Sequence, residues 1–155
     1  LLAEGLRRAG DAAAQAGVKL AVETHGGTLA ATAEMTLELI QRVDHPAVGI
    51  LLDWYWLWVA GDGPEVVSQL APHVVHVHVK DGVREQERHR TVRLGDGEID
   101  WPAVMGALCE AGYEGFFSDE HEKIWRPELP DSREAMPGNL VVLRCWLKLA
   151  GYELR

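Results

Sequence analysis

The chain has 155 residues, of which 47% are hydrophobic and 25% charged, and this composition suits one globular domain over residues 1–155. Its formal net charge of −9 argues against nucleic acid and anionic membranes as partners, because both repel an acidic surface. No apolar run reaches the roughly 18 residues of a membrane-spanning helix, and two cysteines alone fit a reducing cytoplasm, where we expect the protein to reside.

Helical and strand patterns alternate along the chain. Strands are predicted at 18–23, 47–53, 74–79 and 115–119, and helices at 1–16, 33–43, 101–111 and 138–150, with a further short helix that begins at Pro64. We expect a polar loop over 81–99 and a proline-rich loop over 125–137. Residues 54–58 carry three alternating tryptophans, a pattern typical of a strand or an extended loop.

Strands that alternate with helices predict a parallel α/β sheet. A doubly wound sheet places a G-x-G-x-x-G turn after its first strand, whereas this chain has Glu-Thr-His-Gly-Gly-Thr there. A barrel of the TIM type places its chemistry at the carboxyl ends of many strands, which fits better. Since a full barrel needs about 250 residues and eight strands, we predict a half barrel of about four β/α units. A second copy or a missing N-terminal half would complete it.

One acidic or imidazole side chain stands at the end of each predicted strand: Glu23, Asp53, His78 and Glu120. Strand side chains alternate between faces, so these four can share one face and converge at one end of the barrel. Three carboxylates and one imidazole suit a single divalent cation. This recurrence predicts a metal-dependent enzyme.

Neighbouring side chains extend the predicted site. His25 has the parity of Glu23, and Lys80 has that of His78, so both are expected near the substrate. Trp56 offers a flat aromatic face for the C–H side of a sugar ring, although a hydrophobic plug or a subunit contact explains such tryptophans equally well. In the 81–99 loop, most charged residues are expected to be solvated, with Arg84 the nearest to the strand end.

Several segments together resemble the xylose isomerase-like TIM barrel family, also called the sugar phosphate isomerase/epimerase family. They are Ala-Val-Glu-Thr-His-Gly-Gly, Gly-Ile-Leu-Leu-Asp, Val-His-Val-His-Val-Lys-Asp, Leu-Gly-Asp-Gly-Glu-Ile-Asp-Trp and Gly-Tyr-Glu-Gly-Phe-Phe-Ser-Asp-Glu-His-Glu. They follow the order of the C-terminal half of the family's barrel. One departure is Trp56, which stands where many members have a histidine three residues after the strand-end aspartate.

The resemblance implies that Glu23, Asp53, His78 and Glu120 bind one divalent ion, commonly Mn, Mg, Co or Zn. It also implies that Glu23 and Glu120 exchange the proton beside a carbonyl, and that Arg84 holds substrate oxygens. We therefore expect a metal-dependent isomerase or epimerase of a sugar or polyol. Two alternatives remain: a dehydratase of a keto-polyol, which uses the same enediolate chemistry, and a non-catalytic half barrel that binds metal or sugar.

Overall fold

Four parallel strands form the main sheet of the computed structural model, which describes residues 1–86 and 88–154. The strands are β1 (Leu20–Glu23), β2 (Val48–Asp53), β3 (Val74–Val79) and β6 (Phe117–Asp119). They lie in the order β1-β2-β3-β6, and each neighbouring pair is parallel. The predicted α/β architecture with a parallel sheet is therefore confirmed.

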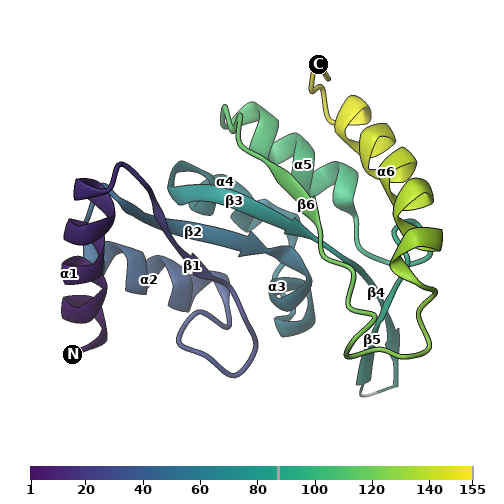
Figure 1. Cartoon of the computed structure of the whole chain (residues 1–155), viewed down its shortest axis with the longest axis horizontal. Helices are drawn as coiled ribbons and strands as arrows, with labels where there is room; N and C mark the ends of the chain where they lie inside the picture. The colour runs from purple at the N-terminus through teal and green to yellow at the C-terminus, as the bar shows by residue number, and fades with distance from the viewer. Residues whose placement is uncertain (87, 155) are drawn as a thin grey trace.

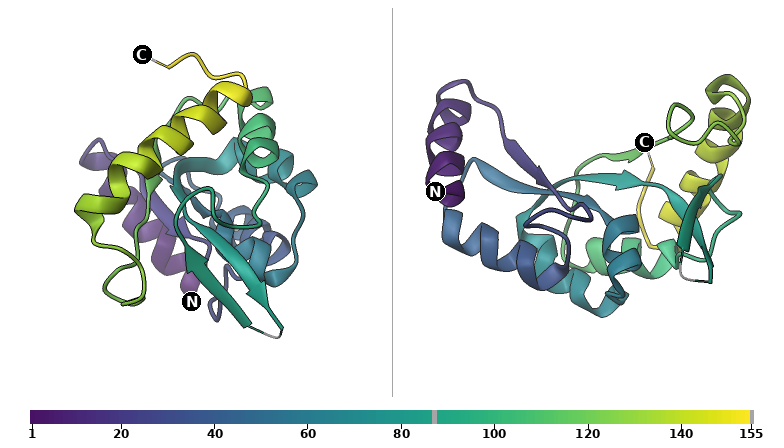
Figure 2. Two further views of the ribbon diagram at one scale, coloured as in Figure 1. Left: turned by 90° about the vertical axis from the view of Figure 1, so that its right-hand side faces the viewer. Right: turned by 90° about the horizontal axis from the view of Figure 1, so that it is seen from below.

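Six α-helices accompany the sheet in the described residues. They are α1 (Leu2–Gln15), α2 (Ala33–Val43), α3 (Trp54–Ala60), α4 (Val67–Leu70), α5 (Trp101–Glu110) and α6 (Ser132–Leu149), with 3₁₀ turns at Pro64–Val66 and Ala71–His73. Helices α1 and α6 lie at opposite ends of the molecule (Figure 1). Seen from below, the sheet is curved, and helices run along its outer side (Figure 2). None of the helices described is long and apolar enough to span a membrane.

The two faces of the sheet differ in how well they are covered. The side chains of Ile50, Leu52, Val77 and Val79 are completely buried and belong to the core that the helices close. Of the residues with the opposite parity, Leu51 and His76 are half-buried, whereas Asp53 is completely buried. Because side chains alternate along a strand, Asp53 and His78 project on this less covered side, as the sequence predicts.

The prediction of a strand or extended loop over residues 54–58 is wrong, because these residues form the first turns of α3. In a helix, positions three apart share a face, and here Trp54 and Leu57 are both buried in the core. Gly61 ends the helix in the left-handed conformation, with φ of 95°. Trp56 therefore lies on the opposite side of the helix from Trp54, and the three tryptophans do not form one aromatic face.

The prediction of a loop over 81–99 is also wrong for its first part. Strands β4 (Asp81–Glu85) and β5 (Arg88–Val92) form an antiparallel hairpin there. Glu87 lies outside the described residues. Asp81 accepts backbone hydrogen bonds from Gly82, Gly95 and Gly97 at 2.9–3.0 Å. This carboxylate thus joins the segment that follows β5 to the start of the hairpin.

The last helix begins earlier than predicted, at Ser132 rather than near 138. The Asp131 side chain accepts a hydrogen bond from the backbone N–H of Arg133 and so caps the helix start. Pro137 then lies inside α6. A proline near a helix start removes one backbone bond, and the cap offsets part of that loss.

Candidate metal centre

The carboxyl ends of the four strands bring the predicted ligands together. Asp53 pairs with His78 across β2 and β3, and His78 with Ser118 across β3 and β6. One ligand atom from each of Glu23, Asp53, His78 and Glu120 lies within 4.8 Å of the other three. Residues far apart in the chain thus form one cluster because parallel strands end at the same edge.

The cluster holds polar atoms that the described protein atoms leave without a hydrogen bond of acceptable angle. They are both carboxylate oxygens of Asp53, Nδ1 of His78 and Oε2 of Glu120, and all are buried. Buried polar groups are normally paired, so each such atom needs an explanation. Three carboxylates and an imidazole whose donor atoms converge in this way fit a divalent cation.

Lys80 lies within this cluster rather than above it. Its side chain is 3% exposed, and Nζ lies 2.7 Å from Oδ2 of Asp53 and 3.0 Å from Oε2 of Glu120. A third acid, Glu122, accepts a hydrogen bond from the same ammonium at 3.2 Å. The sequence predicts Lys80 on the correct face, but its ammonium lies among the candidate ligands rather than beyond them.

The pKa values of the two carboxylates that Lys80 contacts most closely, Asp53 and Glu120, are shifted in opposite directions. Burial raises the pKa of Asp53 to about 7, although Lys80 opposes that effect. The contact with His78 lowers the pKa of Glu120 to about 2, with further help from Lys80. The same contact raises the pKa of His78, whose Nδ1 lies 2.9 Å from Glu120 and 3.4 Å from Glu23. Glu120 is therefore ionised at neutral pH, while Asp53 still takes up a proton there.

A cavity of about 340 Å³ opens beside the cluster. Of the residues expected to hold substrate, His25, Trp56 and Lys80 line it, together with Glu23 and Glu120. Four further residues line it, Tyr55, Glu122, Trp125 and Arg126, and sequence reasoning missed all of them except Glu122. Glu122 shares the parity of Glu120, which was a usable signal. Trp125 and Arg126 reach the cavity through a turn, since both donate backbone hydrogen bonds to the carbonyl of Glu122.

His25 and Trp56 form one wall of this cavity. Their ring centroids lie 4.3 Å apart, and Nδ1 of His25 lies 2.8 Å from the carbonyl oxygen of Gly26. A carbonyl can only accept, so Nδ1 carries the proton in this contact and Nε2 is an acceptor when the ring is neutral. A Cβ at Gly26 would lie 2.8 Å from Cε3 of Trp56, so glycine leaves the room that the indole needs.

Arg84 lies elsewhere. Its guanidinium carbon is 4.4 Å from the centroid of the Trp58 ring, and Nη2 donates a 2.7 Å hydrogen bond to the carbonyl of Trp58. Arg84 is absent from the cavity lining given above. It joins the β4–β5 hairpin to the end of α3, and the structure does not bring it to the predicted ligands.

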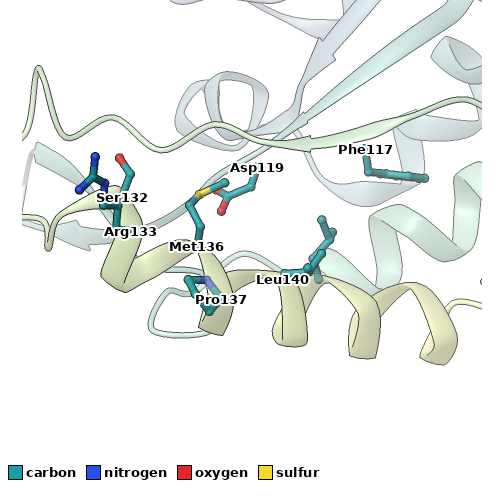
Figure 3. Close-up of a pocket in the computed structure, with 8 residues that line it drawn as sticks. Phe117, Asp119, Ser132, Arg133, Met136, Pro137 and Leu140 are labelled. Carbon is teal, nitrogen blue, oxygen red and sulfur yellow. The ribbon is translucent and has the colours of Figure 1, made fainter.

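A larger cavity, of about 780 Å³, lies between β6 and α6. Phe117 and Asp119 line it from the strand, and Met136 and Leu140 line it from the helix (Figure 3). Because side chains alternate along β6, these strand residues point away from the side that carries Ser118. This apolar cavity is therefore separate from the metal-ligand cluster.

A family model named "Xylose isomerase-like TIM barrel" matches residues 1–138. The chain belongs to this family. A solved structure of the IolI protein with a bound zinc atom has a TM-score of 0.82 at 22% identity, covering 97% of this chain and 56% of that one. A family protein from Mycobacterium smegmatis in complex with magnesium has a TM-score of 0.77 at 22% identity, with coverages of 96% and 50%. Both likenesses show the fold.

Two curated relatives share one name. An inosose dehydratase of Geobacillus thermodenitrificans is 35% identical over 139 residues, which are 79% of this chain and 47% of the relative. One from Clostridium perfringens is 33% identical over 138 residues, with coverages of 79% and 46%. The chain thus spans about half the length of the curated relatives it matches.

A structural relative agrees with them. The probable 3-DHS dehydratase AsbF of Bacillus anthracis has a TM-score of 0.76 at 25% identity, covering 92% of this chain and 55% of that one. The prediction of an isomerase is therefore corrected, because these relatives are named dehydratases. The sequence does not distinguish isomerisation from dehydration, because both reactions begin with removal of the proton beside a carbonyl.

Proposed function

We propose that this chain carries the metal centre of a dehydratase that removes water from a small keto-polyol, such as an inosose. The observation that carries the proposal is the convergence of four donor groups, Glu23, Asp53, His78 and Glu120, beside a cavity of about 340 Å³. The relatives named inosose dehydratase support the choice of reaction. The zinc and magnesium in related structures support a divalent ion.

A divalent cation held by these four residues would act as a Lewis acid that stabilises negative charge on the substrate oxygen. The protein has to supply the proton transfers. In the reaction, the C–H bond beside the carbonyl and the C–O bond of the next carbon both break. A carbon–carbon double bond forms, and the hydroxyl leaves as water with one proton. A base and an acid are therefore needed at the cavity.

Glu23 is the better base of the two strand-end glutamates. Its side chain is 38% exposed at the cavity, and its one ion-pair contact among the described residues is with His78 at 3.4 Å. Glu120 lies closer to His78 and also contacts Lys80, and its low pKa makes it a weak base. Glu23 would take the proton from carbon and pass it to the leaving hydroxyl, while Glu120 stays ionised.

The other cavity residues would orient the substrate. The unprotonated Nε2 of a neutral His25 accepts a hydrogen bond from a substrate hydroxyl, and the Trp56 ring packs against its C–H face. Lys80 faces the same cavity with an ammonium that suits a substrate oxygen. These groups match the alternating hydroxyls and C–H bonds of a polyol.

The main sheet has four strands, whereas a TIM barrel has eight. We propose that the described part of the chain acts as a half barrel, and that four further strands complete it. These strands would come from a second copy or from an N-terminal half. Light scattering tests the first source, since a second copy predicts a dimer of this chain.

The proposed reaction is tested by incubating the protein with a keto-inositol and Mn²⁺ in D₂O. The wild type is expected to form the unsaturated ketone and to exchange the proton beside the carbonyl. Glu23→Gln should lower both rates by about 100-fold or more, as expected for loss of a general base. Metal binding without either reaction would instead support a binding module. A Glu23→Gln variant that exchanges at the wild-type rate would exclude Glu23 as the base.

A further inference from the structure

The Lys80 ammonium makes the same contacts that a metal ion would need. Its Nζ lies 2.7 Å from Oδ2 of Asp53 and 3.0 Å from Oε2 of Glu120. Both oxygens are buried, and the protein leaves them without a well-directed hydrogen bond. Two of the four candidate ligands are thus held by a positive charge that belongs to the chain itself.

This charge has a clear role in the metal-free protein. Asp53 is fully buried, and a buried carboxylate without a counter-charge is strongly unfavourable. Lys80 offsets its charge at an ion-pair distance of 2.7 Å. A divalent cation at the same oxygens would meet the ammonium at close range, where two like charges repel strongly in a weakly polar environment.

We propose that Lys80 is the resident counter-ion of the metal centre, and that a divalent cation binds by displacing its ammonium from Asp53 and Glu120. The proposal rests on the metal centre of the proposed function. Lys80 thereby lowers the affinity for metal while it compensates the buried charge of Asp53.

The structure also provides a place for the displaced ammonium. Glu122 already contacts Nζ at 3.2 Å through Oε1, and its Oε2 accepts a 2.9 Å hydrogen bond from the hydroxyl of Thr91 on β5. Thr91 is 2% exposed, so Glu122 is held in position. The rings of Tyr55 and Trp56 lie 5.5 Å and 5.7 Å from Nζ, within the range of cation–π attraction.

These contacts define what metal binding does to Lys80. The ammonium leaves Asp53 and Glu120 but keeps Glu122 and the aromatic rings, all of which line the cavity. Its freed N–H groups then face the space that a substrate would occupy. Metal binding therefore also makes the Lys80 ammonium available to contact the substrate.

Calorimetric titration with Mn²⁺ at pH 8 tests the proposal on the purified protein. Lys80→Met removes the charge and keeps most of the side-chain volume, and it should bind Mn²⁺ about tenfold or more tightly than the wild type. Lys148→Met makes the same change in net charge at an exposed position on α6. Its affinity should stay within about twofold of the wild type, because distant surface charges are screened.

Two further variants keep the test decisive if Lys80→Met fails to fold. Glu122→Gln removes the alternative partner of the ammonium and should weaken Mn²⁺ binding severalfold. Lys80→Arg keeps the charge and should not bind more tightly than the wild type. Circular dichroism before titration shows which variants are folded.

The outcomes separate this proposal from the proposed function. Tighter binding by Lys80→Met alone supports displacement. Wild-type affinity or weaker binding in a folded Lys80→Met protein overturns the role of Lys80 and leaves the metal centre intact. If Lys80→Met cannot be tested, an unchanged or tighter affinity of Glu122→Gln overturns it. Absence of Mn²⁺ binding in every folded variant overturns the metal centre and the displacement together.

Discussion

Thr24 and Asp53 exchange two hydrogen bonds through one hydroxyl. Oγ1 of Thr24 accepts the backbone N–H of Asp53 and donates to its carbonyl oxygen, both at 2.9 Å. Thr24 is completely buried and follows Glu23 directly in the chain. This pair fastens the end of β1 to the end of β2 and thus sets the spacing between the carboxylates of Glu23 and Asp53.

Thr24→Val keeps the side-chain shape but removes this hydroxyl. Two buried backbone groups of Asp53 would then lack partners, which should lower the free energy of unfolding by about 2 to 4 kcal/mol. Urea denaturation measures the change. Thr24→Ser retains the hydroxyl and serves as the control. Equal stability of the valine and serine variants would show that the hydroxyl contributes little.

Asp53→Asn should stabilise the protein in the absence of metal and weaken its binding of metal. Burial raises the pKa of Asp53 from 3.8 to about 7, so the folded protein holds a proton that the unfolded chain has already lost. Such a group contributes stability at low pH, and that contribution disappears as the pH rises through about 7. At pH 8 in EDTA, the neutral asparagine should therefore raise the melting temperature, with a smaller gain at pH 5.

Added Mn²⁺ should reverse that ranking, because the wild type gains stability from the bound ion and Asp53→Asn loses a ligand. Differential scanning calorimetry with and without Mn²⁺ measures both effects. Asp11→Asn, at a side chain that is 67% exposed, controls for the change in net charge. A lower melting temperature for Asp53→Asn in EDTA at pH 8 would contradict the expected cost of the buried charge.

Metal affinity should fall as the pH drops below about 7. Asp53 must be ionised and Nδ1 of His78 unprotonated to bind a cation, and the pKa of each is raised in the metal-free protein. Between pH 8 and pH 6 the dissociation constant for Mn²⁺ should increase by about tenfold or more. Titration at three pH values measures this. A constant affinity over that range would argue against protons as competitors.

Gly26→Ala should disturb the cavity wall through Trp56. The added Cβ would lie 2.8 Å from the indole, so the ring must shift, at a cost of about 1 to 3 kcal/mol. Trp56→Phe removes the outer ring that the Cβ would meet. The double variant Gly26→Ala/Trp56→Phe should therefore lose less stability than the two single changes summed. Additive losses in urea denaturation would mean that the two sites do not interact.

Asp81→Asn should weaken the fold without changing the affinity for metal. The Asp81 carboxylate accepts hydrogen bonds from four backbone N–H groups, of Gly82, Gly95, Gly97 and Ile99. An amide nitrogen cannot accept those on its side, so we expect a loss of about 2 kcal/mol or more in unfolding free energy. The dissociation constant for Mn²⁺, measured on the folded fraction, should stay within about twofold. A strong loss of affinity would mean that the hairpin shapes the ligand cluster.

The strands and their end residues were readable from the sequence because buried parallel strands are apolar runs that a polar residue terminates. Parity then placed Glu23, Asp53, His78 and Glu120 correctly on one side. The helix over Trp54–Ala60 was not readable, since its tryptophans also fit the period of a strand. The hairpin was hidden because Gln86, with φ of 55°, occupies a turn position that usually carries glycine.

The position of Lys80 could not be derived in the same way. Strand parity gives the side of the sheet but says nothing about where a long, flexible side chain ends. Here the four-carbon stem returns the ammonium to the carboxylates of Asp53 and Glu120. Charge attraction at the buried acids, rather than the strand pattern, decides its place.

All four candidate ligands lie on one uninterrupted stretch of chain, between Glu23 and Glu120. The proposed metal centre, carried in this way, would be inherited as a single unit during gene fusion or recombination. If this segment were joined to different partner halves, different residues from those halves would line the substrate cavity. Changes in substrate preference within such a lineage can then arise by exchange of the partner half, while the proton-transfer chemistry passes on unaltered.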